Sequence, residues 1–193
     1  MILDSSNNFL YVAGSFSTYK TIPVQKIVRL KTNSGINSGT IDNSFINNIL
    51  TTINFGQVNS MILDSKYRLI LVGEYSSKII RLNANGSFDN SFNFGSGFDA
   101  AVNSVAIDSY GKILVGGAFT IYNGSTTQYG RIIRLNDNGS VDVNFNSATG
   151  AVGFNGTVNS IVVLPLSGKV IVGGTFSSYN AISIGRIAAL NND

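Results

Sequence analysis

The chain has 193 residues and a formal net charge of +3, and charged side chains make up only 12% of it. Histidine, cysteine and tryptophan are absent, which excludes disulfide and thiolate chemistry and removes histidine from any catalytic site. No cluster of Lys and Arg, no apolar run of roughly 20 residues and no basic N-terminal segment of a signal peptide is present, so we expect neither a nucleic-acid partner nor membrane insertion.

An internal repeat runs through the whole chain in four copies. Each copy has a first apolar run, a turn, a second apolar run and, after a variable loop, a third apolar run. The first runs cover residues 1–4, 61–64, 105–108 and 161–164, the second 9–16, 69–75, 113–119 and 170–176, and the third 27–30, 79–82, 132–135 and 187–190. A repeat of this size is one supersecondary unit that buries its apolar face only against its neighbours.

Alternation of apolar and polar residues within the runs predicts short antiparallel strands. Gly116-Gly117 favours a bulge, and Asn85-Gly86 and Asn138-Gly139 favour type I′ hairpin turns. Each of these two turns leads to a predicted fourth strand, at residues 87–92 and 140–145, with a looser match at 40–45. The expected core residues between the units are Ile79, Leu82, Val115, Phe119, Ile132, Leu135 and Val172.

These elements predict an all-β chain, a β-propeller with four repeats of about 44–60 residues and antiparallel blades of three or four strands. No helix longer than about two turns is expected. The expected blades of this single domain are residues 1–57, 58–101, 102–157 and 158–193, the last one incomplete. Either a neighbouring segment completes the ring or the four blades are an arc of a larger one, and we favour the arc.

The motifs resemble those of a known repeat family. Val-Asn-Ser at residues 102–104, Asp-Ser-x-Gly-Lys at 108–112, Val-Gly-Gly-x-Phe at 115–119, Ile-x-Arg-Leu-Asn at 132–136 and Asn-Gly-Ser-x-Asp-x-x-Phe at 138–145 are similar to the delta-60 repeat. This β-propeller repeat occurs in bacterial surface proteins and phage-encoded proteins. The resemblance implies a propeller with binding or structural roles, and the family supplies no catalytic motif to transfer.

Charged residues recur at fixed positions in the repeat. Arg29, Arg81 and Arg134 each precede an aspartate, namely Asp42, Asp89 and Asp142. Three equivalent pairs fit a structural charge-assisted hydrogen bond better than three catalytic sites. Asp4, Asp64 and Asp108 begin turns, where aspartate caps backbone N–H groups. The loops 83–89 and 136–142 carry alternating oxygen donors but too few carboxylates for calcium, so we expect hairpin turns, no metal site and no cofactor.

Loop length varies on only one expected face of the propeller. Because alternate turns of a meander point the same way, the loops after the second and fourth strands share this face, while Lys112 and Asn138 lie in the short turns opposite. Tyr19, Tyr122 and Tyr179 recur in one loop slot, where they either contact a partner or fill the gap between blades. The expected partner-contact residues are Tyr19, Tyr122, Asn123, Tyr129, Phe154, Tyr179 and Asn180.

Two function classes follow from these patterns. The first is a non-enzymatic structural or interaction module of a phage virion (tail or receptor-binding apparatus) or a bacterial surface protein, which places the chain outside the cell. It would bind protein subunits or a surface glycan through the variable loop face, within a larger assembly. The second is a carbohydrate-active enzyme on the propeller axis, which needs two convergent carboxylates; Asp99 is the clearest acid on the variable loops.

Overall fold

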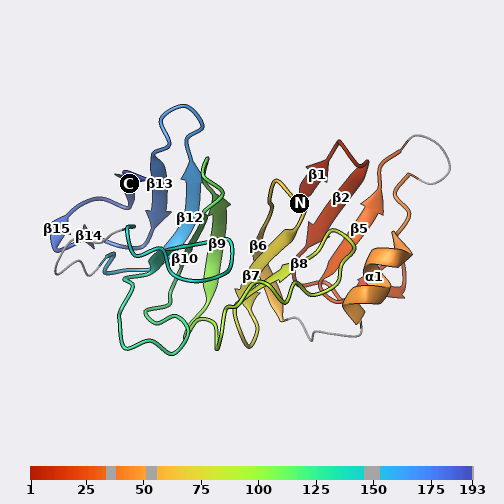
Figure 1. Cartoon of the computed structure of the whole chain (residues 1–193), viewed down its shortest axis with the longest axis horizontal. Helices are drawn as coiled ribbons and strands as arrows, with labels where there is room; N and C mark the ends of the chain where they lie inside the picture. The colour runs from red at the N-terminus through yellow and green to blue at the C-terminus, as the bar shows by residue number, and fades with distance from the viewer. Residues whose placement is uncertain (34–37, 51–55, 146–152, 193) are drawn as a thin grey trace.

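The computed structural model describes residues 1–33, 38–50, 56–145 and 153–192. Nearly all regular structure in these residues is β, in small antiparallel sheets (Figure 1). The four main sheets have three strands each and correspond to the four repeats of the sequence, so we call them blades 1 to 4. This arrangement confirms the prediction of an all-β chain with antiparallel blades.

Each blade is built from three consecutive segments of the repeat. Blade 1 contains β1 (Ile2–Asp4), β2 (Phe9–Ala13) and β5 (Ile27–Lys31), and blade 2 contains β6 (Gln57–Leu63), β7 (Leu69–Glu74) and β8 (Ile79–Leu82). Blade 3 contains β9 (Val102–Ile107), β10 (Ile113–Gly117) and β11 (Ile132–Leu135), and blade 4 contains β12 (Val158–Val163), β13 (Val170–Gly174) and β16 (Ile187–Leu190). Two short hairpins, β3 (Thr18–Tyr19) with β4 (Ile22–Pro23) and β14 (Ser178–Tyr179) with β15 (Ile182–Ser183), lie in the loops of blades 1 and 4.

The predicted fourth strands are reduced to single bridges. Val141 bridges Leu135 and Phe88 bridges Leu82, and neither segment continues as a strand. The aspartate after each bridge turns the chain away: the Oδ1 atom of Asp142 accepts the N–H of Asn144 at 3.2 Å. A side chain that binds the backbone two residues ahead favours a turn over an extended ladder.

Blade 1 differs from the prediction because its fourth segment becomes a helix. The sequence predicted a loose strand over residues 40–45 and a loop beyond it, whereas α1 spans Asn43–Leu50. Asp42 caps the helix, its Oδ1 accepting the N–H of Ser44 at 3.1 Å. Phe45, Ile46 and Ile49 are buried, so one face of α1 packs into the core. With 8 residues, the helix stays within the predicted limit of about two turns.

The Asn-Gly turns have a different geometry from the predicted type I′. Only the glycines have positive φ, 89° at Gly86 and 87° at Gly139, whereas a type I′ turn needs positive φ at both central residues. The N–H of Gly139 donates to the carbonyl of Asn136 at 3.0 Å, and Ser140 pairs with Asn136 across the turn. This pattern is a type I turn followed by a left-handed glycine, the usual three-residue hairpin loop.

The core lies between neighbouring blades. Three clusters of buried residues are arranged along the row, each with members from two adjacent blades. All seven predicted core residues are buried, with exposures of 0–1%. The predicted bulge at Gly116-Gly117 is confirmed by a register shift between these residues. Blades 1 and 4 stand at opposite ends of the row (Figure 1).

Candidate functional site

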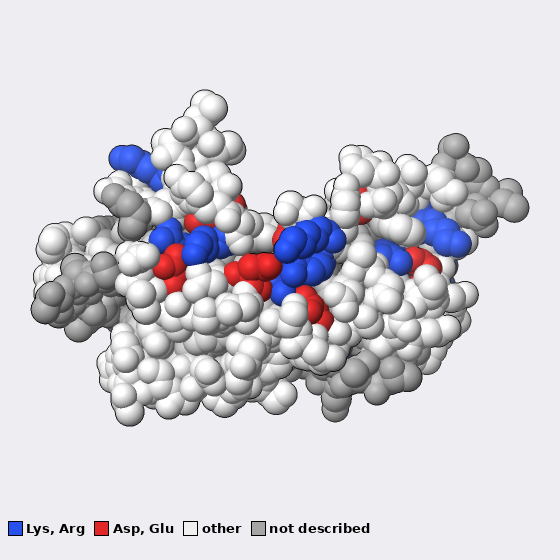
Figure 2. Space-filling model, viewed as in Figure 1, with Lys and Arg blue, Asp and Glu red and all other residues white. Residues whose placement is uncertain are grey.

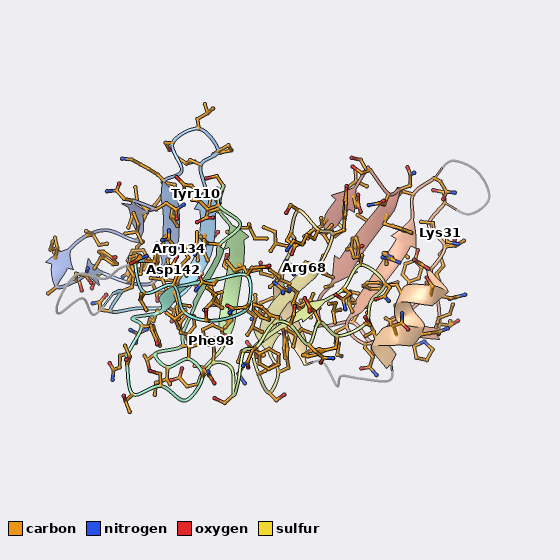
Figure 3. The ribbon with its side chains drawn as sticks, viewed as in Figure 1. Lys31, Arg68, Phe98, Tyr110, Arg134 and Asp142 are labelled. Atoms are coloured by element: carbon orange, nitrogen blue, oxygen red, sulfur yellow. The ribbon has the colours of Figure 1, made fainter. Side chains whose placement is uncertain are left out.

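The repeated arginines join each blade to the next. Arg81 donates through Nε to Asp89 Oδ2 at 2.8 Å, which confirms the predicted pair within the blade. Its Nη1 then donates to the carbonyl of Asp137 at 2.6 Å, in the Asn-Gly hairpin of the following blade. Arg134 repeats this pattern with Asp142 at 3.0 Å and with the carbonyl of Asn192 at 2.5 Å. We call these contacts the arginine latches, and Figure 3 shows Arg134 beside Asp142.

Blade 1 has the same latch, and its electrostatics indicate a structural role. Arg29 donates to Asp42 and to the carbonyl of Ala84 in blade 2. Burial of Asp42 would raise its pKa, but hydrogen bonds from Ser44 and Arg29 outweigh this effect and hold the pKa below its ordinary value. A carboxylate that stays ionised and fully bonded is a poor proton donor, so these pairs fit the predicted structural role.

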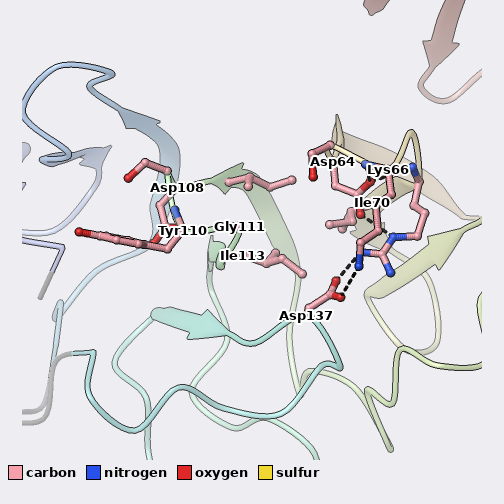
Figure 4. A pocket seen from close by; sticks show the side chains of 12 residues that line it. Asp64, Lys66, Ile70, Asp108, Tyr110, Gly111, Ile113 and Asp137 are labelled. Carbon is pink, nitrogen blue, oxygen red and sulfur yellow. Dashed lines mark hydrogen bonds and ion pairs between the residues drawn. The ribbon is translucent and has the colours of Figure 1, made fainter.

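A charged cleft of about 330 Å³ lies between blades 2 and 3 (Figure 4). Arg68 donates to Asp64 Oδ2 at 2.6 Å and also pairs with Asp137, on which Lys66 and Arg81 converge. Burial would raise the pKa of Asp137, but these cations lower it to about 2. Figure 2 shows the charged side chains in a band across an otherwise uncharged face.

The carboxylates of this cleft are occupied by internal partners. Asp64 Oδ1 accepts the N–H groups of Lys66 and Arg68, and Asp108 Oδ1 accepts those of Tyr110 and Lys112. These bonds confirm the predicted capping role. Within the described part of the chain, no group of three or more acidic residues is arranged to hold a metal ion.

Two of the predicted contact residues are buried. Tyr122 and Phe154 each have 1% exposure, so their side chains pack inside the chain, and their contact with a partner stays a prediction. The Tyr122 ring lies 4.6 Å from that of Phe98, and its hydroxyl donates to the carbonyl of Gly139 at 2.7 Å. The Phe154 ring lies 4.2 Å from that of Phe176. Tyr122 belongs to a buried cluster with residues of blades 2 and 3, which agrees with the alternative interpretation of an aromatic that fills the gap between blades.

Four of the remaining predicted residues hold loops together. Asn180 Oδ1 accepts the N–H of Gly153 at 2.8 Å, and Asn123 Oδ1 accepts the N–H of Ser96 at 3.2 Å. The Tyr179 ring packs 4.7 Å from that of Phe154, and the Tyr19 hydroxyl donates to the carbonyl of Gly39 at 2.9 Å.

Asp99, the candidate acid of the enzyme hypothesis, also fastens a loop. Its Oδ1 accepts the N–H groups of Thr120 and Ile121, both at 2.9 Å. Burial would raise the pKa of Asp99, but these hydrogen bonds lower it below the ordinary value. The carboxylate therefore remains ionised and engaged at neutral pH.

Three of the predicted residues nevertheless share one pocket. A pocket of about 260 Å³, which we call the amide pocket, is lined by Asn93, Tyr122, Asn123, Ser125, Tyr129, Asn138, Gly139, Ser140 and Val141. None of these lining residues is charged. Asn93, Asn123 and Asn138 are exposed, and Tyr129 is half-buried, so amide and phenol groups border an open hollow.

The amide pocket combines regions that the sequence assigned to opposite faces. Tyr129 and Asn123 belong to the variable loop between β10 and β11, while Asn138 belongs to the short turn after β11. The two regions meet because β11 has only 4 residues and the Tyr122 hydroxyl holds the turn at Gly139. Sequence reasoning missed Asn93, Ser125 and Ser140, since nothing in their local pattern separates them from other polar loop residues.

Comparison with known proteins identifies the repeat. A model of the family described as "Domain of unknown function (DUF5122) beta-propeller" matches residues 6–45, 68–92, 111–145 and 167–193, which is more than half of the chain. The chain belongs to this family. Each matched block begins in the turn after the first strand of a blade, so the DUF5122 match follows the four blades. It supports a β-propeller repeat family, and the narrower delta-60 name remains an interpretation of the motifs.

Structural similarity shows the same fold. The crystal structure of the WD40 beta propeller domain of Doa1 matches with a TM-score of 0.57 and 13% sequence identity. The match covers 90% of this chain and 46% of that chain, so the DUF5122 chain spans less than half the length of its structural relative. No curated protein sequence matches the chain. None of the described helices is long and apolar enough to cross a membrane.

Proposed function

We propose that this chain is a non-enzymatic interaction module that binds an uncharged polar ligand, a glycan of a cell or virion surface, in the amide pocket. The observation that carries the proposal is the composition of the pocket, which is lined by asparagine, tyrosine and serine side chains without any charged side chain. Aromatic and amide side chains together suit the apolar faces and hydroxyl groups of a sugar. A volume of about 260 Å³ fits a single sugar unit of a longer chain.

The setting we propose is a phage tail or receptor-binding apparatus, or a bacterial surface protein. The motif resemblance and the surface poor in charge support this setting. An antibody against the chain should label intact virions or cells, and labelling only after lysis would contradict it.

A protein partner is the second candidate for this module. It is favoured by apolar side chains exposed at the turns between first and second strands, with Tyr110 at 78% and Leu166 at 104% exposure. The enzyme alternative needs two free convergent carboxylates. The described acids of the charged cleft and of the loops are instead bonded to arginines, lysines or backbone N–H groups.

The test is binding of the whole chain to an array of neutral and anionic glycans. We expect neutral glycans to bind, and Tyr129→Ala or Asn138→Asp to weaken binding at least tenfold. Asn138→Asp keeps the Oδ1 acceptor for the N–H of Ser140 but removes the amide donor. The matched control is Tyr110→Ala, which removes an exposed tyrosine from the charged cleft. Binding that survives both pocket variants, or that is lost in the control, would overturn the proposal.

A further inference from the structure

The outer face of blade 4 has no neighbouring blade among the described residues. It consists of the side chains of β12, β13 and β16 that point away from blade 3, and we call it the blade-4 face: Ser160, Val162, Ile171, Gly173, Ile187 and Ala189. It contains no charged residue. Val162 is 53% exposed and Ile187 is 68% exposed, both high for apolar strand residues.

The same positions are buried in blade 3. Ala106 pairs with Leu114 between the first two strands of blade 3, and Val162 pairs with Ile171 in the same way in blade 4. Ala106 and Leu114 are therefore the equivalents of Val162 and Ile171. Ala106, Leu114 and Ile132 have exposures of 7%, 0% and 1% and form one cluster with residues of blade 4. The blade-4 face is therefore equivalent to a surface of blade 3 that is buried against the next blade.

Polar contacts between blades repeat at equivalent positions. Asn59 Nδ2 donates to the carbonyl of Val102 at 3.0 Å, and Asn103 Nδ2 donates to the carbonyl of Val158 at 3.0 Å. Asn159 occupies this position in blade 4 and is exposed. Ser104 Oγ likewise accepts the N–H of Ile161 at 3.0 Å, and its equivalent Ser160 is exposed.

A glycine marks the close approach of two blades. A Cβ atom on Gly116 would lie 2.4 Å from Val158 Cγ1 of blade 4, so a side chain there would collide with the neighbouring blade. Gly173 occupies the equivalent register position in blade 4, and a Cβ atom there would meet nothing within 4 Å. Blade 4 thus retains the space for a neighbour.

Blade 1 offers the complementary surface. Met1 and Leu3 are 86% and 64% exposed, on the side of β1 whose counterparts in blade 2, Met61 and Leu63, pack against blade 1. The solved WD40 propeller adds a measure of length, because 90% of this chain covers 46% of that chain. Two rows of four blades would therefore be about as long as that WD40 chain.

We propose that the blade-4 face packs on the β1 side of blade 1 in a second copy of this chain, and that two copies close head to tail into one ring. A two-fold arrangement uses the same contact twice and leaves neither face exposed. Eight blades lie within the known range of propellers. Between blades 3 and 4, Ser104 lies beside Ile161. If the new contact has the same alignment of first strands, Val162 lies beside Leu3 of the second copy. The association does not require the amide pocket.

The test is the mass of the whole chain in solution, measured by light scattering after size exclusion at micromolar concentration. We expect twice the mass of one chain, and at least a tenfold weaker association for Val162→Asp and Ile187→Asp. Val143→Asp is the matched control, because Val143 is 76% exposed and lies outside the face. Far-UV circular dichroism checks that each variant folds. A monomeric parent chain, or a dimer that both variants leave intact, overturns the proposal.

Cross-linking distinguishes the head-to-tail contact from other dimers. The chain has no cysteine, so a mixture of Leu3→Cys and Val162→Cys chains reports only the new pair. We expect the mixture to form a disulfide-linked dimer of one chain of each kind under mild oxidation. A Val162→Cys chain that cross-links efficiently with itself would show the two blade-4 faces in contact and would overturn the proposal.

Discussion

Removal of one arginine latch tests how the blades are held together. The Arg81→Ala variant removes a side chain that is only 1% exposed. In the parent chain, this side chain donates to Asp89 and to the backbone carbonyl and Oδ1 of Asp137, and its guanidinium lies 4.7 Å from the centre of the Phe92 ring. Breaking a buried ion pair from one side costs about 3–5 kcal/mol, because a buried charge loses its partner. Ser91 still donates to Asp89, which moves the expected loss of unfolding free energy toward about 3 kcal/mol.

The control variant removes Lys66, an exposed cation that pairs with the same Asp137 carboxylate as Arg81. Lys66 Nζ lies 3.2 Å from Asp137, but the Lys66 side chain is 64% exposed, so Lys66→Ala should cost about 1 kcal/mol or less. Urea unfolding followed by far-UV circular dichroism measures both variants, since the chain has no tryptophan to report by fluorescence. Equal losses in the two variants, or an Arg81→Ala loss below about 1 kcal/mol, would refute the latch.

Three further predictions concern packing and pH. Leu135→Ala should lower the unfolding free energy by about 2–5 kcal/mol, and an unchanged urea midpoint would contradict the strand register. Gly116→Val should destabilise more than Gly173→Val in the monomeric chain, because only Gly116 faces a neighbouring blade within its own chain; thermal melting of the pair at low concentration checks this order. The pKa values of Asp42, Asp89 and Asp137 are lowered in the folded state, so their stabilisation is present above the ordinary aspartate pKa of about 4 and is lost as the pH falls below it, with Asp137 titrating at about pH 2. Urea midpoints between pH 5 and pH 2 should fall accordingly, and Asp137→Asn should flatten that fall.

The strands could be predicted because their signals are local and repeated. An apolar or alternating apolar and polar run recurs in all four copies, as in Ile132-Ile133-Arg134-Leu135. Each copy therefore supports the strand prediction for the others. The arginine pair within a blade was also predictable, since Arg134 and Asp142 face each other across one hairpin. The second half of the latch was not, because Arg81 and Asp137 are 56 residues apart and belong to different blades.

The candidate site was less predictable than the fold. A recurring tyrosine signals a repeated environment, but it does not say whether that environment is a binding surface or a gap in the core. Tyr122 is buried by Phe98, which comes from the loop that precedes β9, and no local pattern predicts that contact. In blade 1, the spacing of Phe45, Ile46 and Ile49 is helical, yet the loose match to strand four in the other copies concealed it.

The location of a bound neutral sugar tests the account most directly. We propose a titration of the isotopically labelled chain with N-acetylglucosamine and galactose, followed through the backbone amide resonances by NMR. We expect saturable shifts confined to the amide pocket, centred on Tyr129, Asn138 and Ser140. Shifts centred on the charged cleft at Arg68 and Tyr110, or no saturable shift with either the sugars or their oligomers, would contradict it.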